Sequence, residues 1–229
     1  MKPAVHHDDS QAETRRQLIE AAGEVFAASG FRNATVREIC RRAGANVAAV
    51  NYHFRDKETL YGEVLRYAHS KATEKYPPLL DVPGDAAPEE KLNAFVKSFL
   101  LRILEKGPTS WHGKLLSREM IEPTAALDVL VEERMKPMAV QLGKIVAAIL
   151  RCPADDERVR LCAFSVVSQC VFYHHCRPVV LRMFPGQPIL ARENIEKLTA
   201  HITQFSLAAM ERLGDRPRAR KARHPKHPV

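Results

Sequence analysis

Residues 35 to 58 read TVREICRRAGANVAAVNYHFRDKE, and this stretch decides the fold. Its first half predicts a short helix over residues 36–42. Thr35 can cap that helix, because its hydroxyl can accept a hydrogen bond from a backbone amide of the first turn. Glu38 stands three residues later, at the reciprocal position of a capping box. The helix therefore has a defined start.

The second half of the stretch predicts a sharp turn and another short helix. Gly44 can adopt the left-handed conformation with which a chain leaves a helix. Asn46 can cap a helix over residues 47–53, and Val50 lies four residues before Phe54, so both can pack against the preceding helix. Two short helices joined in this way form a helix-turn-helix, whose second helix enters the major groove of DNA. Sequence-specific DNA binding is therefore the first hypothesis.

The region around this unit resembles a known family. Residues 14–65 carry AAGEVFAASGF, then TVREICRRAG, then NYHFRDKETLY, and these strings are similar to the DNA-binding domain of TetR-family transcriptional repressors. The resemblance implies that the second short helix reads bases and that its neighbours hold phosphates. It assigns base reading to Asn46, Val47, Ala48 and Asn51, and phosphate contacts to Tyr52, His53 and Lys57.

The chemistry of several side chains agrees with those roles. The carboxamide of Asn51 can pair bidentately with adenine, and Val47 or Ala48 can touch a thymine methyl group. Lys57 can reach a phosphate that the amides at the start of the following helix also attract.

Two further points concern the same interface. Thr35 and Arg37 can contact phosphates at the start of the first short helix. Many relatives have Lys-Gly-Thr-Leu-Tyr where this chain has residues 47–51, so a basic and an aromatic contact are missing. Val47 can accordingly lie either at the DNA or in the core.

The composition excludes several classes of protein. The chain has 229 residues, 45% of them hydrophobic, and it lacks an apolar run of the roughly 18 residues that a membrane span needs. The amino terminus, MKPAVHHDDSQAE, is polar where a signal peptide is apolar. We therefore expect a cytoplasmic protein with no membrane partner. No catalytic set or phosphate-binding glycine loop stands out, so we expect neither an enzyme nor a cofactor.

The net charge of +8 is concentrated at the ends of the chain. Residues 1–55 carry eight Lys or Arg and six Asp or Glu, and residues 215–229 carry six and one. The last fifteen residues, DRPRARKARHPKHPV, cannot bury enough apolar surface to fold alone. They are either a solvated tail or an arm that binds phosphates without reading sequence.

The remaining pattern is helical, which predicts an all-α fold. Apolar residues recur at helical spacing over residues 14–29, and again from Asp56 to about residue 76. The segment PPLLDVPGDAAP, at 77–88, then breaks the pattern. Further helices are expected near residues 88–106, 110–121, 124–150 with a kink at Pro137, 155–176 and 191–213. The expected domains are a flexible terminus (1–12), a three-helix helix-turn-helix domain (13–56), a helical ligand-binding and dimerisation domain (57–214) and a disordered basic tail (215–229).

The carboxy-terminal helices carry a second resemblance. LLSREMIEPTAAL, from residue 115, and SVVSQCVFYHHCRPVV, from residue 165, are similar to the ligand-binding domain of the CecR-like subgroup, which is linked to antibiotic sensitivity. A small-molecule site of this kind needs apolar walls and a few polar groups. The candidate walls are Phe99, Ile103, Trp111, Met120, Phe164, Phe172 and Tyr173, and the candidate polar contacts are His112, Arg118, Glu119, Gln169 and His174. Ordinary core is the alternative position for each of them.

Self-association is the third expectation. The helices near 155–176 and 191–213 are strongly apolar, and the first is apolar on more than one face, as in a helix buried against both its own domain and a partner. The resemblance implies a two-fold dimer through a four-helix bundle. Such a homodimer would place two recognition helices about 34 to 36 Å apart, or a multiple of one DNA turn.

These observations predict a homodimeric repressor that binds a palindromic operator in double-stranded DNA and releases it when a small, largely apolar effector binds. The alternative from another class is an all-α metalloprotein or enzyme that uses His174 and His175 with the nearby Cys170 and Cys176. We expect no metal site, because the five cysteines include no zinc-type pair and suit buried free thiols better.

Overall fold

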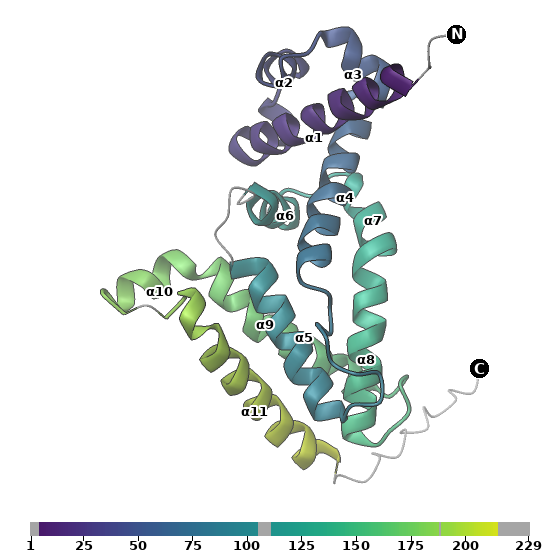
Figure 1. Cartoon of the computed structure of the whole chain (residues 1–229). Helices are drawn as coiled ribbons and strands as arrows, with labels where there is room; N and C mark the ends of the chain where they lie inside the picture. Colours follow the sequence, from purple (N-terminus) through teal and green to yellow (C-terminus); the bar gives the residue numbers. More distant parts are fainter. Residues whose placement is uncertain (1–4, 105–110, 188, 215–229) are drawn as a thin grey trace, which may run out of the picture.

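The computed structural model describes residues 5–104, 111–187 and 189–214. This part of the chain is helical and contains no β-strand, which confirms the all-α prediction (Figure 1). The helices are α1 (Val5–Asn33), α2 (Val36–Ala43), α3 (Val47–Phe54), α4 (Lys57–Lys75), α5 (Pro88–Leu104), α6 (Trp111–Ile121), α7 (Ala126–Leu130), the π-helix η1 (Val131–Met135), α8 (Lys136–Leu150), α9 (Glu157–His175), α10 (Arg177–Met183), the 3₁₀ helix η2 (Arg192–Asn194) and α11 (Ile195–Gly214). Within these residues, no helix is both long and apolar enough to cross a membrane.

The helices form two parts joined by one long helix. Figure 1 shows α1, α2 and α3 at one end, and α5, α8, α9 and α11 at the other. Helix α4 runs from the first part toward the second, and α6 lies between them. We call the first part, with the amino-terminal half of α4, the head, and the second part the body.

The caps expected from the sequence are present in the head. Three side chains accept a hydrogen bond from a first-turn amide: Thr35 from Glu38 N at 3.2 Å, Asn46 from Ala48 N at 3.0 Å and Asp56 from Thr59 N at 2.7 Å. Gly44 ends α2 with φ 64° and ψ 25°, the left-handed conformation that glycine adopts without strain. The three caps and the glycine turn are therefore as predicted, but the Glu38 carboxylate accepts from Arg41 and not, as a capping box would require, from the amide of Thr35.

Two apolar clusters hold the parts together. The head cluster includes Leu18 and Phe26 of α1, Ile39 of α2, Val50 and Phe54 of α3, Leu60, Tyr61, Val64, Leu65 and Ala68 of α4, and Trp111 and Leu115 of α6. The body cluster joins α5, α8, α9 and α11. The first half of α4 therefore belongs to the head core, so the expected boundary at residue 56 cuts through that core.

Several helices differ from their predicted extent. Helix α1 begins at Val5, within the segment expected to be flexible, and it continues past Gly30, whose φ of 77° and ψ of 165° mark a kink, to Asn33. Helix α10 lies between the helices expected at 155–176 and 191–213 and was not predicted; Pro178 occupies its first turn. The expected basic tail at 215–229 lies outside the described residues.

The helix expected at 124–150 is divided into three pieces. A π-helix, η1, separates α7 from α8, and Pro137 lies in the first turn of α8. Proline fits the first turn of a helix because its missing N–H would have no partner there. The chain therefore departs from a regular α-helix over Val131–Met135, just before Pro137. Such π-turns are frequent at functional sites.

Candidate functional site

Helix α3 turns its predicted base-reading residues toward solvent. The four residues expected to read bases, Asn46, Val47, Ala48 and Asn51, are all exposed. Val47 is 46% exposed, so its side chain does not belong to the core of this chain. The opposite side of the helix holds the buried residues Val50 and Phe54. The helix is thus anchored on one side and free to enter a groove on the other.

The two residues predicted to contact phosphates at the start of α2, Thr35 and Arg37, have different surroundings in the structure. Thr35 uses its hydroxyl oxygen to accept from the amide of Glu38, which leaves its O–H as a donor. Arg37 is exposed and has no ion pair among the described residues. The neighbouring arginines are both paired, Arg41 with Glu38 and Arg42 with Glu24. Arg37 is therefore the arginine of α2 best placed to meet a phosphate.

Lys57 has a different environment from the one expected. Its Nζ donates to the carbonyl oxygens of Phe31 at 3.0 Å and Ala34 at 3.2 Å, and it lies 4.5 Å from the centre of the Phe31 ring. These contacts bind the start of α4 to the end of α1. The expectation of a phosphate contact is accordingly revised, because this ammonium group is already engaged inside the head.

The aromatic end of α3 remains available. Tyr52 is 70% exposed, and its ring packs edge-on against the half-buried His53 at 4.9 Å between centroids. The Tyr52 hydroxyl makes only a long hydrogen bond, at 3.4 Å, to Gln11. Its O–H group can therefore turn to a phosphate, whereas the His53 ring is held from two sides.

Four of the predicted ligand contacts instead join the head to α6. Trp111 packs so closely on α1 that a Cβ atom at Gly23 would lie 2.3 Å from its ring. Arg118 fills the corresponding space at Gly30. Glu119 is buried and accepts from the Tyr61 hydroxyl at 2.6 Å. His112 lies beside Trp111, at 3.8 Å between ring centroids.

The contact between Tyr61 and Glu119 is a buried polar link between α4 and α6. Burial and the neighbouring carboxylate both raise the pKa of Tyr61, so its hydroxyl stays protonated and donates. Glu119 also accepts from the amide and hydroxyl of Thr124, at 2.7 and 2.9 Å. The carboxylate is therefore satisfied by the protein and is not left for a ligand. The sequence suggested Glu119 as a polar contact for a ligand, whereas the structure gives its carboxylate partners from α4 and from Thr124.

Three of the predicted pocket walls lie on the surface of the chain. Met120 is 44% exposed, Phe164 62% and Phe172 52%. Phe164 and Phe172 lie eight residues apart on α9, on the same side as the exposed Leu161. Their position suits contact with another chain better than contact with a small molecule.

The remaining predicted contacts come together inside the body. Phe99, Ile103 and Tyr173 pack against the body cluster. His174 lies 2.8 Å from the Ile103 carbonyl oxygen through Nδ1 and 2.6 Å from Ser117 Oγ through Nε2. Burial lowers the pKa of His174, which favours the neutral ring.

Gln169, the last of the predicted polar contacts, bridges two helices of the body. Its amide nitrogen donates to the Ser165 carbonyl oxygen and to Ser206 Oγ, both at 3.2 Å. This side chain ties α9 to α11, because Ser165 and Ser206 lie on those helices. A structural role therefore accounts for its contacts.

Sequence reasoning missed three basic residues near this interior. Arg102 of α5, Arg134 of η1 and His69 of α4 are each partly buried. Burial lowers the pKa of Arg102 to about 10. Burial, together with the charges of Arg102 and Arg134, lowers the pKa of His69 to about 4. The charges of both arginines thus act on His69, whose ring is neutral near pH 7. Arg102, Arg134 and His69 are hereafter called the cation cluster, in which the two arginines carry the charge.

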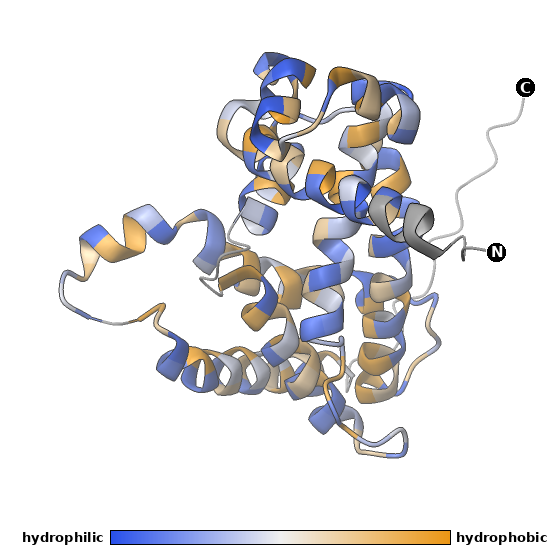
Figure 2. Cartoon of the chain, turned by 45° about the horizontal axis from the view of Figure 1, so that its top comes forward, coloured by the Kyte–Doolittle hydropathy of each residue, from blue (hydrophilic) through white to orange (hydrophobic). Residues whose placement is uncertain are grey.

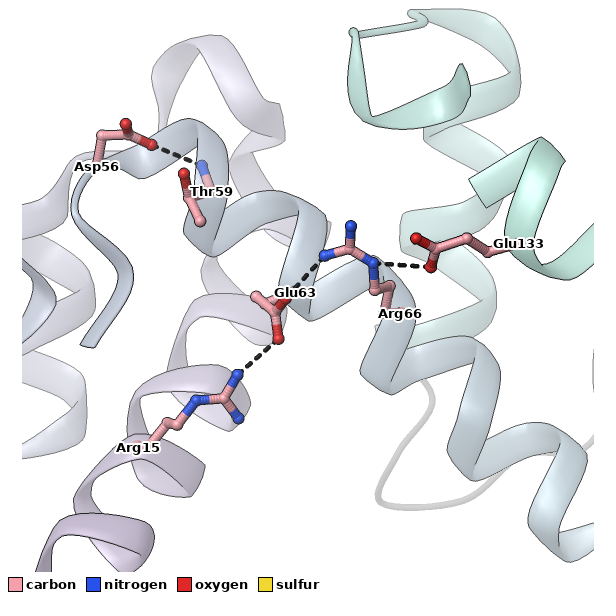
Figure 3. A network of polar contacts seen from close by, with 6 residues as sticks. All are labelled: Arg15, Asp56, Thr59, Glu63, Arg66 and Glu133. Atoms are coloured by element: carbon pink, nitrogen blue, oxygen red, sulfur yellow. Dashed lines mark hydrogen bonds and ion pairs between the residues drawn. The ribbon is translucent and has the colours of Figure 1, made fainter. Parts of the chain in front are cut away.

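A chain of ion pairs connects the head to η1 (Figure 3). Arg15 of α1 contacts Glu63 at 2.6 Å, and the same carboxylate contacts Arg66 at 2.7 Å. Arg66 then reaches Glu133 of η1 at 3.0 Å. Both Glu63 and Arg66 lie on α4. The network therefore runs from the DNA-binding part, along the connecting helix, to the residue that precedes Arg134.

The rival metal site finds no support in the described residues. No group of three or more His, Cys, Asp or Glu side chains that could hold an ion lies together there. The five cysteines are free, and Cys40, Cys162 and Cys170 are buried. Burial raises the pKa of each of these three thiols.

A capped helix-turn-helix with an exposed recognition face, joined by one helix to a larger helical body, defines a DNA-binding transcriptional regulator. Two family models match the chain: bacterial regulatory proteins of the tetR family over residues 18–64, and the C-terminal domain of the HTH-type transcriptional dual regulator CecR over residues 88–210. The chain belongs to the TetR family of bacterial regulators, with a carboxy-terminal domain of the CecR type.

Individual relatives agree with this assignment. The HTH-type transcriptional dual regulator CecR of Shigella flexneri is 29% identical over 210 residues, which cover 88% of this chain and 92% of that protein. A transcriptional regulator from Rhodococcus sp. Rha1 has a TM-score of 0.64 at 18% identity, covering 86% of this chain and 97% of that one. A transcriptional regulator from Saccharomonospora viridis, solved in complex with choline, has a TM-score of 0.62 at 16% identity, covering 85% and 95%.

Proposed function

We propose that this protein is a homodimeric repressor that occupies a palindromic operator and releases it when a small molecule binds to the body. The observation that carries the proposal is the exposed face of α3, with Asn51, Val47 and Ala48 available for base edges. Tyr52 and Arg37 beside it supply phosphate contacts. In this proposal the protein acts in the cytoplasm and needs neither a cofactor nor a membrane.

The dimer surface is the second part of the proposal. Large hydrophobic side chains are exposed on three consecutive helices of the carboxy-terminal region: Leu161, Phe164 and Phe172 on α9, Val179, Leu181 and Met183 on α10, and Phe205 on α11. Figure 2 shows apolar turns on α10, the helix that projects from the body at the left. An exposed apolar patch of this kind marks an interaction surface. A second copy of the chain is the occupant that fits, since a two-fold axis through α9 and α11 pairs these residues with themselves.

Effector-driven release requires a difference between two states. A ligand shifts the protein away from DNA only if it binds the DNA-incompetent arrangement more tightly than the competent one. Two connections support such coupling: the Tyr61–Glu119 hydrogen bond between α4 and α6, and the ion pairs from Arg15 to Glu133. The choline complex of the Saccharomonospora viridis regulator supports a small molecule as the effector of this fold.

The repressor role is tested by transcription in vitro from a promoter that overlaps the tightest-bound sequence. Adding the purified protein should lower the amount of transcript in proportion to operator occupancy. A control promoter with a scrambled sequence should be unaffected. An unchanged or increased transcript at full occupancy would contradict repression while leaving DNA binding intact.

A further inference from the structure

We propose that the effector is an organic anion whose carboxylate is bound by Arg102 and Arg134, beside His69, in the interior of the body. This inference rests on the proposed function, because it names the chemistry of the ligand that releases the DNA. It also replaces the expected apolar effector by one with an apolar frame and a negative end.

Arg102 is a buried cation without a negative partner among the described residues. Its Nε donates to the Ser98 carbonyl oxygen at 3.3 Å, and its Nη1 lies 3.4 Å from the sulfur of Met138. Its Nη2 is buried and has no hydrogen-bond partner. A buried charge in this condition is costly, and a guanidinium presents its nitrogens in a fork that matches a carboxylate. The free end of Arg102 is therefore a site for an oxyanion.

A second guanidinium adds to the same charge, and a neutral imidazole lies beside both. The Nε of Arg134 is buried and likewise has no partner. His69 is near enough to both arginines for their charges to disfavour its protonated form. The three residues come from α4, α5 and η1, three different elements, and both of the charged ones, Arg102 and Arg134, are positive. An anion bound among them would supply the counter-charge that the described residues do not.

The surroundings of the cluster are apolar, which indicates the rest of the ligand. The Arg102 guanidinium lies over the Phe99 ring at 5.4 Å, and Met138 touches it from α8. Phe99 packs against the body cluster, which also contains the buried thiol of Cys170 from α9. A ligand whose charged end meets the arginines would thus lay its remaining atoms on aromatic and sulfur-containing side chains.

The position of Arg134 links this site to the head. It lies in the π-helix directly after Glu133, which contacts Arg66 and, through Glu63, Arg15 of α1 (Figure 3). In this proposal an anion that binds Arg134 acts on the residue next to Glu133 and shifts η1. Glu133 and α4 would then follow. The cation cluster and the ion-pair network therefore share one element, the π-helix η1.

The experiment compares matched acids and amides on the full-length dimer. The probes are benzoate with benzamide, cinnamate with cinnamamide, and octanoate with octanamide, each followed by thermal unfolding. At about tenfold above its Kd, an acid that binds should raise the melting temperature by about 3 °C, and its amide should not. In Arg102→Gln and Arg134→Gln the acid should bind at least tenfold more weakly. Arg160→Gln, which alters an exposed arginine of α9, should bind it as the wild type does.

Two outcomes would overturn the proposal. One is that no acid of the panel shifts the melting temperature more than its own amide does. The other is that Arg102→Met, measured without any probe, melts well below the wild type, because a guanidinium that waits for a ligand should not be needed for stability. DNA binding by the wild type without acid tests the proposed function separately, so the two ideas can fail independently.

Discussion

The head and the body differ in how their buried polar groups are satisfied. At the junction of the head with α6, the buried carboxylate of Glu119 has Tyr61 and Thr124 as partners, and Lys57 meets two carbonyls. In the body, Arg102 and Arg134 each keep a buried nitrogen without a partner. Arg118 Nε at the junction with α6 also lacks a hydrogen-bond partner, but it pairs with Glu122 at 3.5 Å, so this arginine has a negative neighbour that Arg102 and Arg134 lack among the described residues. The head works through its outer face. The body is incomplete inside, which is what a domain that accepts a ligand requires.

The largest expected effect comes from the outer surface of the body. Phe205 is 61% exposed on α11, so Phe205→Glu should leave the single chain folded but place a charge in the dimer interface. A monomer meets only one half-site, and operator affinity should fall by roughly 100-fold or more. Sedimentation, circular dichroism and DNA titration on one preparation measure the three quantities.

Gln204→Glu is the matched control for this variant, because it adds the same charge at the neighbouring exposed position. It should remain dimeric. If Phe205→Glu gives a folded monomer with full operator affinity, the dependence of DNA binding on dimerisation is wrong. If the variant unfolds instead, Phe205 contributes to the core of one chain.

Adding one methyl group at Gly23 tests how tightly α6 packs on the head. In Gly23→Ala the new Cβ would overlap the Trp111 ring, so α6 must shift away from α1. Overpacking of this kind costs about 1 to 3 kcal/mol in the free energy of unfolding. Gly62→Ala on α4 is the control, since its nearest neighbour is an arginine nitrogen at 3.9 Å, and it should stabilise by up to about 1 kcal/mol. Urea unfolding of both variants measures these changes. Equal unfolding midpoints for the two variants would show that α6 does not pack tightly on α1.

Lys57 separates a role inside the head from a role at the DNA. With its Nζ bound to Phe31 and Ala34, Lys57→Ala should lower the free energy of unfolding by about 2 kcal/mol. The salt dependence of DNA binding should stay the same, whereas loss of one phosphate contact would reduce its slope by about one unit. Chemical unfolding and DNA titrations at several salt concentrations are needed. A stable variant with a reduced slope would restore the phosphate contact first expected from the sequence.

The smallest effect concerns acid stability of the body. His69 has a pKa of about 4 in the folded protein, below the ordinary 6.5, because burial and the charges of Arg102 and Arg134 oppose protonation. Between these values the unfolded chain binds a proton that the folded chain does not, so stability falls as the pH drops from 6.5 to 4. His69→Gln should remove this part of the loss, about 1 kcal/mol after screening by solvent. Urea titrations at pH 7 and pH 4.5 measure it. A larger acid loss in the variant would mean that His69 has an anionic neighbour.

The same comparison explains what could be predicted from the sequence. The head depends on short-range signals, since Thr35, Asn46 and Asp56 cap helices that begin beside them. Lys57 could not be predicted in this way, because its acceptors, Phe31 at the end of α1 and Ala34 just after it, lie more than twenty residues earlier. Nor could Phe164 and Phe172 be placed, because an apolar side chain looks alike in a core and in a dimer interface.

One feature of the sequence could have indicated the cation cluster. Arg102 follows Phe95 and Phe99 at helical spacing, so it continues an apolar stripe of α5 with a charge. A buried arginine on such a stripe indicates a partner that must come from elsewhere. The sequence could not show that the partner is missing among the described residues, or that η1 would bring Arg134 to the same place. Both depend on how three distant helices pack.

The central claim is that an outward-facing α3, presented twice by a dimer, reads a two-fold symmetric DNA sequence. Selection of bound molecules from random DNA with the purified full-length protein tests it most directly. We predict a palindrome whose half-sites are centred about one helical turn, or a multiple of one turn, apart. With Asn51→Ala, preference at one base pair per half-site should weaken by about 1 to 3 kcal/mol. Recovery of no preferred sequence, or of a single half-site without symmetry, would contradict the account.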